Sequence, residues 1–283
     1  MSLILGVIVA LIIAGIVAAA FAYLIGLPVL RLKSDYLAIA TLGFAEIIRT
    51  IFQCEVIKLP GGGEIVLGKL TNGANMIKGF PTLNSFNIIG ESGKVSLYLS
   101  TVVPAIIVTI CIVIIVLLIN STYGRSFKAI RDDEIAAEAM GINLAKHKIL
   151  SFCISAFFAG VGGALYAMFA TTYQAKPFTS VLTYEILLIV VTGGIGSVSG
   201  SCIGAFLYIA CSEWWLRFLD EPMFIGSFQV PLLKDGFRMV VFSVVIMIVV
   251  LFFRKGIMGT KELPDLFKKK KIKVKGEVTN DAK

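Results

Sequence analysis

The polar stretch GRSFKAIRDDEIAAEAMGINLAKHK, residues 124–148, lies between two apolar segments of membrane-spanning length, residues 98–119 and 149–171. The chain is 57% hydrophobic and 16% charged, whereas soluble domains carry about a quarter charged residues. Apolar segments of about twenty residues match the length that a helix needs to cross a bilayer. We therefore predict an all-α fold, a polytopic transmembrane helical bundle.

Residues 124–148, here called the polar loop, also carry a helix signal of their own. Asp132, Asp133 and Glu134 open a run of good helix formers that extends to residue 140, and Gly141 is suited to end that helix. Arg125, Lys128 and Arg131 precede this helix, and Lys146 and Lys148 follow it. A short helix with both signs of charge at a membrane surface favours docking of a soluble partner, and the alternative is an ordinary cytoplasmic loop.

Further apolar segments at residues 3–27, 34–52 and 237–253 complete the predicted bundle. With a glycine-broken segment at residues 183–212 they give about six to seven membrane segments. We predict a transmembrane domain over residues 1–260, with a cytoplasmic loop at 120–148, and a basic cytoplasmic tail over 261–283; the resemblance described below implies that the domain is a permease and that the loop couples it to an ATPase.

The glycine-broken segment contains TGGIGSVSGS, residues 192–201, here called the glycine break. Gly193, Gly194 and Gly196 make a uniform helix unfavourable there. Irregular backbone inside a membrane occurs only where protein buries it or where it lines a cavity. The break is therefore a candidate wall of a translocation path, and the alternative is a tight hairpin between two short spans.

One predicted span, residues 34–52, carries two charged residues. Glu46 and Arg49 are three residues apart and can meet on one helical face. Charges deep in a bilayer are costly, so the pair either faces protein or water, with Glu46 beside the translocation path, or lies at the outer rim.

Basic residues set the predicted orientation. Placing the polar loop inside puts 17 of the 26 Lys and Arg residues inside and seven outside, as the positive-inside rule requires. The N-terminus then lies outside, and the region 172–236 crosses an even number of times. Residues 3–27 have no basic residue before them, which predicts a retained span rather than a signal peptide.

Several kinds of chemistry are missing. The single histidine, His147, cannot build a metal site alone, and the segment GESGK at 90–94 lacks the glycine and the hydroxyl residue of a phosphate loop. The glycine break has Val198 where a nucleophilic serine would stand. We expect no catalytic residues, no metal and no cofactor. The basic tail indicates anionic lipid near a cytoplasmic end rather than nucleic acid.

Four segments together closely resemble the LivM-type permease subunits of branched-chain amino acid ABC transporters. They are SDYLAIATLGFAEIIR (34–49), LTNGANMIKGFP (70–81), YGRSFKAIRDDEIAAEAMGIN (123–143) and VTGGIGSVSGSCIGAF (191–206). The resemblance spans roughly residues 20–260, and four motifs in the right order make it specific.

The resemblance implies a multi-pass protein of a prokaryotic plasma (inner) membrane that imports solute and is not itself an enzyme. Its implied partners are a second homologous permease subunit, two cytoplasmic ATPase subunits, an extracytoplasmic solute-binding protein and membrane lipid. It also implies that the polar loop carries a coupling helix that docks on the ATPase. The coupling residues would be Asp132, Asp133, Glu134, Ala136, Ala137, Glu138 and Gly141.

The sequence departs from the family pattern in two places. The importer signature is Glu-Ala-Ala, three residues and Gly; Ala136, Ala137 and Gly141 fit, but Ile135 stands where the glutamate would be. Members also usually carry further spans before the segment that matches residues 3–27, and this sequence lacks them.

Three other functions are compatible with the composition. An ABC permease for urea or short amides would keep the mechanism and change the cargo. An ion-coupled secondary transporter or channel would work without an ATPase and would need an intramembrane acid, with Glu46 the first candidate and Glu185 the second. A membrane scaffold without transport activity is disfavoured by the glycine break.

Overall fold

The structure is a computed structural model of the 283-residue chain. It describes residues 2–30, 32, 34–54, 56–58, 64–66, 88–89, 95–97, 99–171, 173–215, 224–225, 228–229, 241, 243–244, 247, 251, 256–259 and 262. The fold is a helical membrane bundle, which confirms the predicted fold class. The chain divides into two compact units, Met1–Ser180 and Val181–Lys283.

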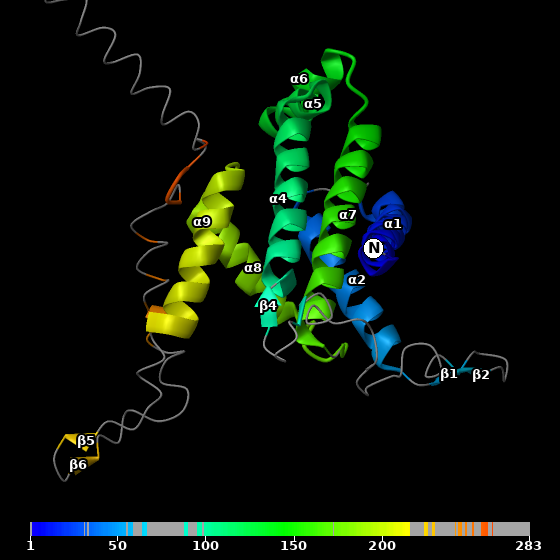
Figure 1. The fold of residues 1–283 in the computed structure, drawn as a ribbon. Helices are drawn as coiled ribbons and strands as arrows, with labels where there is room; N and C mark the ends of the chain where they lie inside the picture. The colour runs from blue at the N-terminus through cyan, green and yellow to red at the C-terminus, as the bar shows by residue number, and fades with distance from the viewer. Residues whose placement is uncertain are drawn as a thin grey trace, which may run out of the picture. The chain divides into compact units, whose positions relative to one another are not determined.

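The first unit contains the long apolar helices (Figure 1). In chain order its helices are α1 (Ser2–Val29), α2 (Ser34–Gln53), α4 (Leu99–Asn120), α5 (Thr122–Asp132), α6 (Glu134–Ala139) and α7 (Leu144–Ala170). Among the described residues, four helices are long and apolar enough to cross a membrane: they lie within α1, α2, α4 and α7. These four correspond to the spans predicted at 3–27, 34–52, 98–119 and 149–171.

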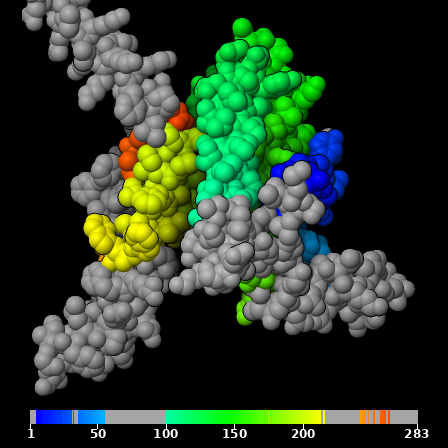
Figure 2. Space-filling model, in the orientation of Figure 1, coloured from blue at the N-terminus to red at the C-terminus, as the bar shows by residue number. Residues whose placement is uncertain are grey.

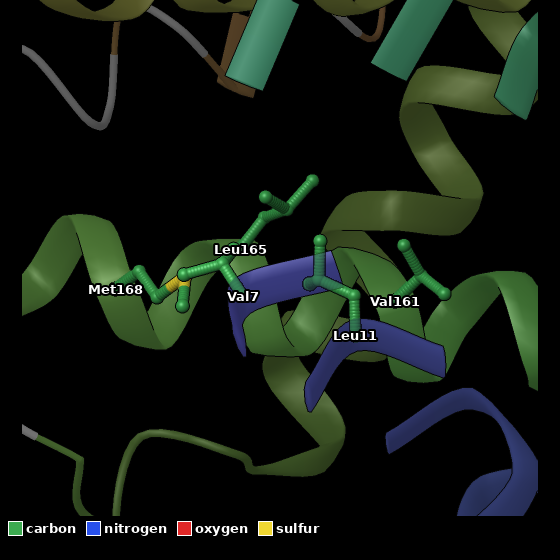
Figure 3. Close-up of a cluster of buried hydrophobic side chains, with 5 residues drawn as sticks. All are labelled: Val7, Leu11, Val161, Leu165 and Met168. Carbon is green, nitrogen blue, oxygen red and sulfur yellow. The ribbon is translucent and has the colours of Figure 1, made fainter. Parts of the chain in front are cut away.

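The core of the first unit lies between α1 and α7 (Figure 3). Val7 and Leu11 of α1 pack against Val161, Leu165 and Met168 of α7, and Ile107 and Cys111 of α4 contact the same cluster. Much of the remaining apolar surface faces outward, and Figure 2 shows the side chains of α4 as one continuous face. Such outward apolar faces suit lipid or neighbouring membrane helices.

The polar loop is more helical than predicted. Arg125, Lys128 and Arg131 lie on α5, and Lys146 and Lys148 lie near the start of α7, rather than in an irregular loop. The prediction that Asp132 opens the short helix is wrong in position, because Asp132 is the last residue of α5. Gly124 permits the turn from α4 into α5, since a Cβ there would lie 2.1 Å from the carbonyl oxygen of Ile119.

The second unit contains the broken helix pair, α8 (Ser180–Gly193) and α9 (Val198–Ile209), followed by the π-helical turn η2 (Ala210–Trp215). The two helices are bent by 118° at the glycine break, so the predicted interruption is confirmed. Trp214 and Trp215 lie in η2 and are exposed. The predicted final span at 237–253 and the basic tail lie almost wholly outside the described residues.

Within the described residues, three short antiparallel hairpins lie outside the helices. They pair β1 (Val56–Lys58) with β2 (Glu64–Val66), β3 (Ile88–Ile89) with β4 (Val95–Leu97), and β5 (Phe224–Ile225) with β6 (Phe228–Gln229). In the first hairpin Val56 lies opposite Val66. The GESGK segment at 90–94 lies outside the described residues.

Small residues allow α1 and α7 to approach closely. A Cβ on Gly160 would lie 2.6 Å from the Cβ of Ala18 and 2.8 Å from the carbonyl oxygen of Ala14, both on α1. In a membrane, helix association depends on this kind of close van der Waals packing because lipid is as apolar as the helices.

Gly160→Ala is therefore expected to destabilise the first unit by about 1–3 kcal/mol through overpacking. Gly162→Ala on the same helix is the matched control, because no described atom beyond its own helix lies within 4 Å of its Cβ position. The control is expected to be neutral, or more stable by up to about 1 kcal/mol through helix propensity. Thermal unfolding of both variants in one detergent tests this, and equal midpoints would contradict the packing.

Candidate functional site

The candidate docking site is the frame formed by α5, α6 and α7. Asp133 ends one helix and begins the next: its N–H donates to the carbonyl of Ala129 at 3.0 Å, and its Oδ1 accepts from the N–H groups of Ile135 and Ala136 at 2.9 and 3.1 Å. Its backbone is extended, as an N-cap requires. One carboxylate therefore fixes the position at which the chain turns from α5 into α6.

Gly141 closes the other end of α6, as the sequence predicts. Its φ is +83°, its N–H donates to the carbonyl of Glu138 at 2.9 Å, and the N–H of Ile142 donates to the carbonyl of Ala137 at 3.1 Å. This pair of bonds is the Schellman arrangement, which favours glycine at the left-handed position. Asn143 then caps α7 by accepting from the N–H of Lys146 at 3.0 Å.

Side chains hold α6 to the neighbouring helices. Glu134 Oε1 lies 2.7 Å from Nζ of Lys148 on α7. Ala137 is only 4% exposed and faces inward, whereas Ile135 and Met140 are each 83% exposed. A six-residue helix that is capped at both ends therefore presents two large apolar side chains outward.

The predicted coupling residues thus have different structural roles. Ala136 donates to the Asp133 cap, and Asp132 pairs with Arg131 at 3.1 Å rather than joining α6. Glu138 supplies a carbonyl to the C-terminal cap through Gly141. The helix at 134–139 brings most of these residues together, while their contacts with another protein stay a prediction.

His147 is half-buried against α5. Its ring centroid lies 6.4 Å from that of Tyr123 and 6.2 Å from that of Phe127, and its Nδ1 is 2.9 Å from the carbonyl oxygen of Asn143. The sequence did not predict that these rings lie together, because Tyr123 and Phe127 face His147 only when α5 begins at Thr122.

An open cavity of about 710 Å³, also absent from the sequence predictions, adjoins this frame. Its apolar lining comes from the ends of α1 and α2 together with α5 and α7, and its polar lining includes members of the α5–α6–α7 frame. The lining residues are Leu30, Leu32, Leu37, Phe127, Ile130, Arg131, Glu134, His147, Lys148, Ser151, Phe152 and Ser155.

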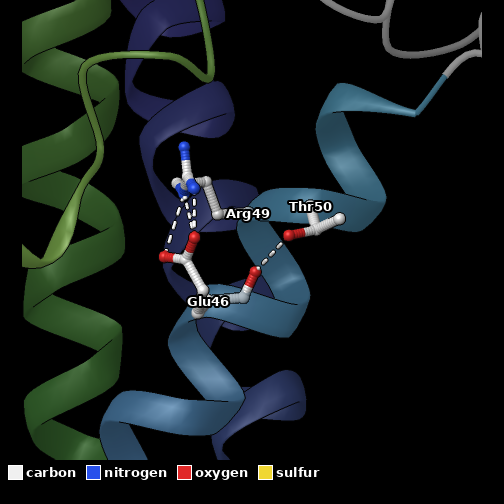
Figure 4. A network of polar contacts seen from close by, with 3 residues as sticks. All are labelled: Glu46, Arg49 and Thr50. Atoms are coloured by element: carbon white, nitrogen blue, oxygen red, sulfur yellow. Dashed lines mark hydrogen bonds and ion pairs between the residues drawn. The ribbon is translucent and has the colours of Figure 1, made fainter.

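Glu46 and Arg49 meet on α2, which confirms the expected pairing (Figure 4). The Arg49 Nε lies 3.0 Å from both carboxylate oxygens, and the Thr50 hydroxyl donates to the Glu46 carbonyl at 2.8 Å. Pairing lowers the cost of placing both charges in hydrocarbon. It therefore explains Glu46 without an ion-coupling role, and the place of Glu46 beside a translocation path stays a prediction.

The glycine break is packed closely against backbone. A Cβ on Gly193 would lie 2.4 Å from the carbonyl oxygen of Gly200. Gly194 has φ +123°, and a Cβ there would lie 2.7 Å from the carbonyl oxygen of Gly259. Gly196 has φ +101° and is exposed. Gly193 and Gly194 are thus buried by protein in this conformation, which is one of the two ways that irregular backbone is tolerated in a membrane.

Asp133→Ala is expected to weaken α6, because loss of an N-cap costs about 1 kcal/mol. Amide exchange over residues 134–141 should then rise about fivefold, the ratio that corresponds to that free energy. Asp133→Asn is the matched control, since asparagine also caps well but carries no charge. Exchange that rises equally in both variants would contradict the capping role and assign the effect to charge.

The chain is similar to known membrane transport proteins. The chain matches the family model described as "Branched-chain amino acid transport system / permease component" over residues 1–253. It is 33% identical over 218 residues to the high-affinity branched-chain amino acid transport system permease protein LivM of Escherichia coli (strain K12), covering 75% of this chain and 51% of that protein.

Two further relatives are more distant. The probable branched-chain amino acid transport permease protein LivM of Methanocaldococcus jannaschii is 27% identical over 209 residues, covering 73% of this chain and 54% of the relative. The ribose import permease protein RbsC of Bacillus subtilis (strain 168) is 28% identical over 190 residues, covering 64% of this chain and 53% of the relative. No solved structure matches the chain.

The chain spans about half the length of these curated relatives. The family match nevertheless extends from residue 1 to residue 253 and includes both the α5–α6–α7 frame and the glycine break. This chain therefore belongs to the family of branched-chain amino acid transport system permease components.

Proposed function

We propose that this chain is a permease subunit of an ABC importer for branched-chain amino acids in a prokaryotic inner membrane. The family membership and the LivM relatives support the cargo, and the four long apolar helices support the membrane location. The proposed partners are a second homologous permease, two cytoplasmic ATPase subunits and an extracytoplasmic solute-binding protein. ATP hydrolysis takes place in the ATPase subunits.

The observation that carries this proposal is a pair of exposed apolar side chains at α6, Ile135 within the helix and Met140 at its C-cap. Ile135 and Met140 are each 83% exposed on a helix that is otherwise fixed by Asp133, Gly141 and the Glu134–Lys148 ion pair. A buried apolar side chain is a common centre of a protein interface, and polar residues around it exclude water. We propose that α6 docks on an ATPase subunit through these two side chains.

In the mechanism that we propose, ATP binding closes the ATPase pair and α6 transmits that movement to the membrane helices. The path formed with the second permease then alternates between outward-facing and inward-facing states. Energy reaches the path only if the ATPase contacts differ between the two states. Glu46 is paired with Arg49, so this scheme needs no free intramembrane acid at that position.

The ribose permease relative makes another polar solute the second candidate cargo, in line with the urea and short-amide alternative. Competition uptake in cells separates these cargoes: leucine, isoleucine and valine should compete with one another, while ribose, urea and acetamide should not.

Purification of the tagged chain in mild detergent is expected to retain two ATPase subunits and a second permease, identified by mass spectrometry. The double variant Ile135→Ser, Met140→Ser should lose at least about tenfold of the bound ATPase, equivalent to about 1.4 kcal/mol. The matched control Ile135→Leu, Met140→Leu keeps both side chains apolar and should retain the bound ATPase. Recovery of the chain alone in repeated preparations would instead favour a secondary transporter.

Gly141→Pro is expected to uncouple ATP hydrolysis from uptake while the protein still inserts. Proline fixes φ near −65° where the chain has +83°, and it removes the N–H that donates to Glu138. Uptake should fall about tenfold or more at equal protein level, with ATPase activity retained. Gly141→Asn is the control, because asparagine tolerates the left-handed region. Unchanged uptake in Gly141→Pro at normal protein level would refute the role of α6.

A further inference from the structure

A short segment after the predicted last span packs directly on the glycine break. The N–H of Ile257 donates to the carbonyl of Thr192 at 2.9 Å, and the N–H of Met258 donates to the carbonyl of Gly193 at 3.1 Å. A Cβ on Gly256, whose φ is +72°, would lie 2.5 Å from the Cα of Gly194. Backbone thus meets backbone without intervening side chains, and the last carbonyl groups of α8 obtain donors from this segment.

Glu262 extends the same contact to α9. Its carboxylate accepts the N–H of Val198 at 2.8 Å, the N–H of Ser199 at 3.2 Å and the hydroxyl of Ser199 at 2.5 Å. These are the N–H groups that the first turn of a helix leaves without intrahelical partners, and a negative charge there also matches the helix dipole. Ser197, 3% exposed, caps the next position by accepting from the N–H of Gly200 at 3.0 Å.

The surroundings keep the Glu262 carboxylate ionised. Partial burial raises its pKa, while the hydroxyl of Ser199 and the N–H groups of Val198 and Ser199 lower it, and the net pKa lies below the ordinary value. The group is therefore an acceptor for all of its donors at neutral pH.

The membrane side of this contact follows from the charge of the tail. Residues 268–271 are four consecutive lysines, and basic residues after a final span indicate the cytoplasmic side. Glu262 lies only six residues before them. The turn between α8 and α9 therefore belongs at the cytoplasmic face, with both helices entering from the opposite face.

We infer that Glu262 is a positioning residue that caps α9 and thereby joins the glycine break to the end of the last span as one moving unit. This inference rests on the proposed transport function. The joined unit forms the cytoplasmic end of the path wall, and transport needs it to move without separating. Among the described residues no single helix passes through the break, because α8 ends and α9 begins there.

The test compares Glu262→Ala, Glu262→Gln and Glu262→Asp in the assembled transporter. Asp265→Asn is the matched control, since it removes the same charge three residues further along. Two readouts are taken: deuterium exchange of the amides in residues 195–201, and amino acid imported per ATP hydrolysed. Glu262→Ala should raise the exchange about tenfold and lower the import ratio about threefold or more. Glu262→Gln keeps one acceptor oxygen but loses the second oxygen and the charge, and it should show smaller changes in the same direction.

A double-mutant cycle shows whether Glu262 acts through α9. Ser199→Ala removes one donor to the carboxylate, so its effect on exchange should be less than additive with that of Glu262→Ala. Rescue of the import ratio by Glu262→Asp would further separate positioning from general loss of stability. If Glu262→Ala fails to accumulate, Glu262→Gln and Ser199→Ala provide the same two readouts.

Unchanged exchange in Glu262→Ala would overturn the cap. Raised exchange with a wild-type import ratio would overturn the role in transport. Failure of the proposed function looks different: uptake would then persist without any ATPase, while the comparison of exchange between Glu262→Ala and Asp265→Asn would still report on the cap.

Discussion

The constraint on which this structure depends is that a backbone in hydrocarbon has no water to bond to. Long helices meet it internally, and every place where a helix stops needs another partner for its N–H or C=O groups. This chain supplies protein partners at two places where helices stop, the polar loop and the glycine break. Asp133, Gly141 and Asn143 serve the polar loop, while Ser197, Glu262 and the N–H groups of Ile257 and Met258 serve the glycine break.

The two regions meet this constraint over different sequence distances. In the polar loop each cap comes from a neighbouring residue, so the turn from α5 through α6 to α7 is specified locally. At the glycine break the Glu262 carboxylate lies 63 and 64 residues beyond the N–H groups of α9 that it accepts, and the N–H groups of Ile257 and Met258 each lie 65 residues beyond their acceptors on α8. The first region therefore depends only on residues close to it in the sequence, whereas the second also requires residues 257–262.

Much of this fold could be predicted because the length of an apolar segment and the local caps of a helix depend on residues that are neighbours in the sequence. The spans at 3–27, 34–52 and 98–119, the helix end at Gly141 and the pairing of Glu46 with Arg49 all followed from short-range rules. The helix predicted to open at Asp132 begins two residues later, at Glu134, because Asp132 ends α5 and the extended backbone of Asp133 makes it the cap between the two helices. The packing of His147 on α5 and the contacts of Glu262 could not be predicted, because they join residues whose proximity depends on tertiary structure.

The capping of α6 also bears on how much energy the proposed docking could transmit. Allosteric coupling between two sites is typically about 1–3 kcal/mol. A helix of six residues is too short to be stable alone. Without its caps, α6 would unfold when a free energy of that size acted on it, and its neighbours would not move. An N-cap stabilises by about 1 kcal/mol and an exposed ion pair by up to about 1 kcal/mol. Together, Asp133 and the Glu134–Lys148 pair are of the same order as the coupling itself, which is what a short helix needs if movement at Ile135 and Met140 is to reach α7.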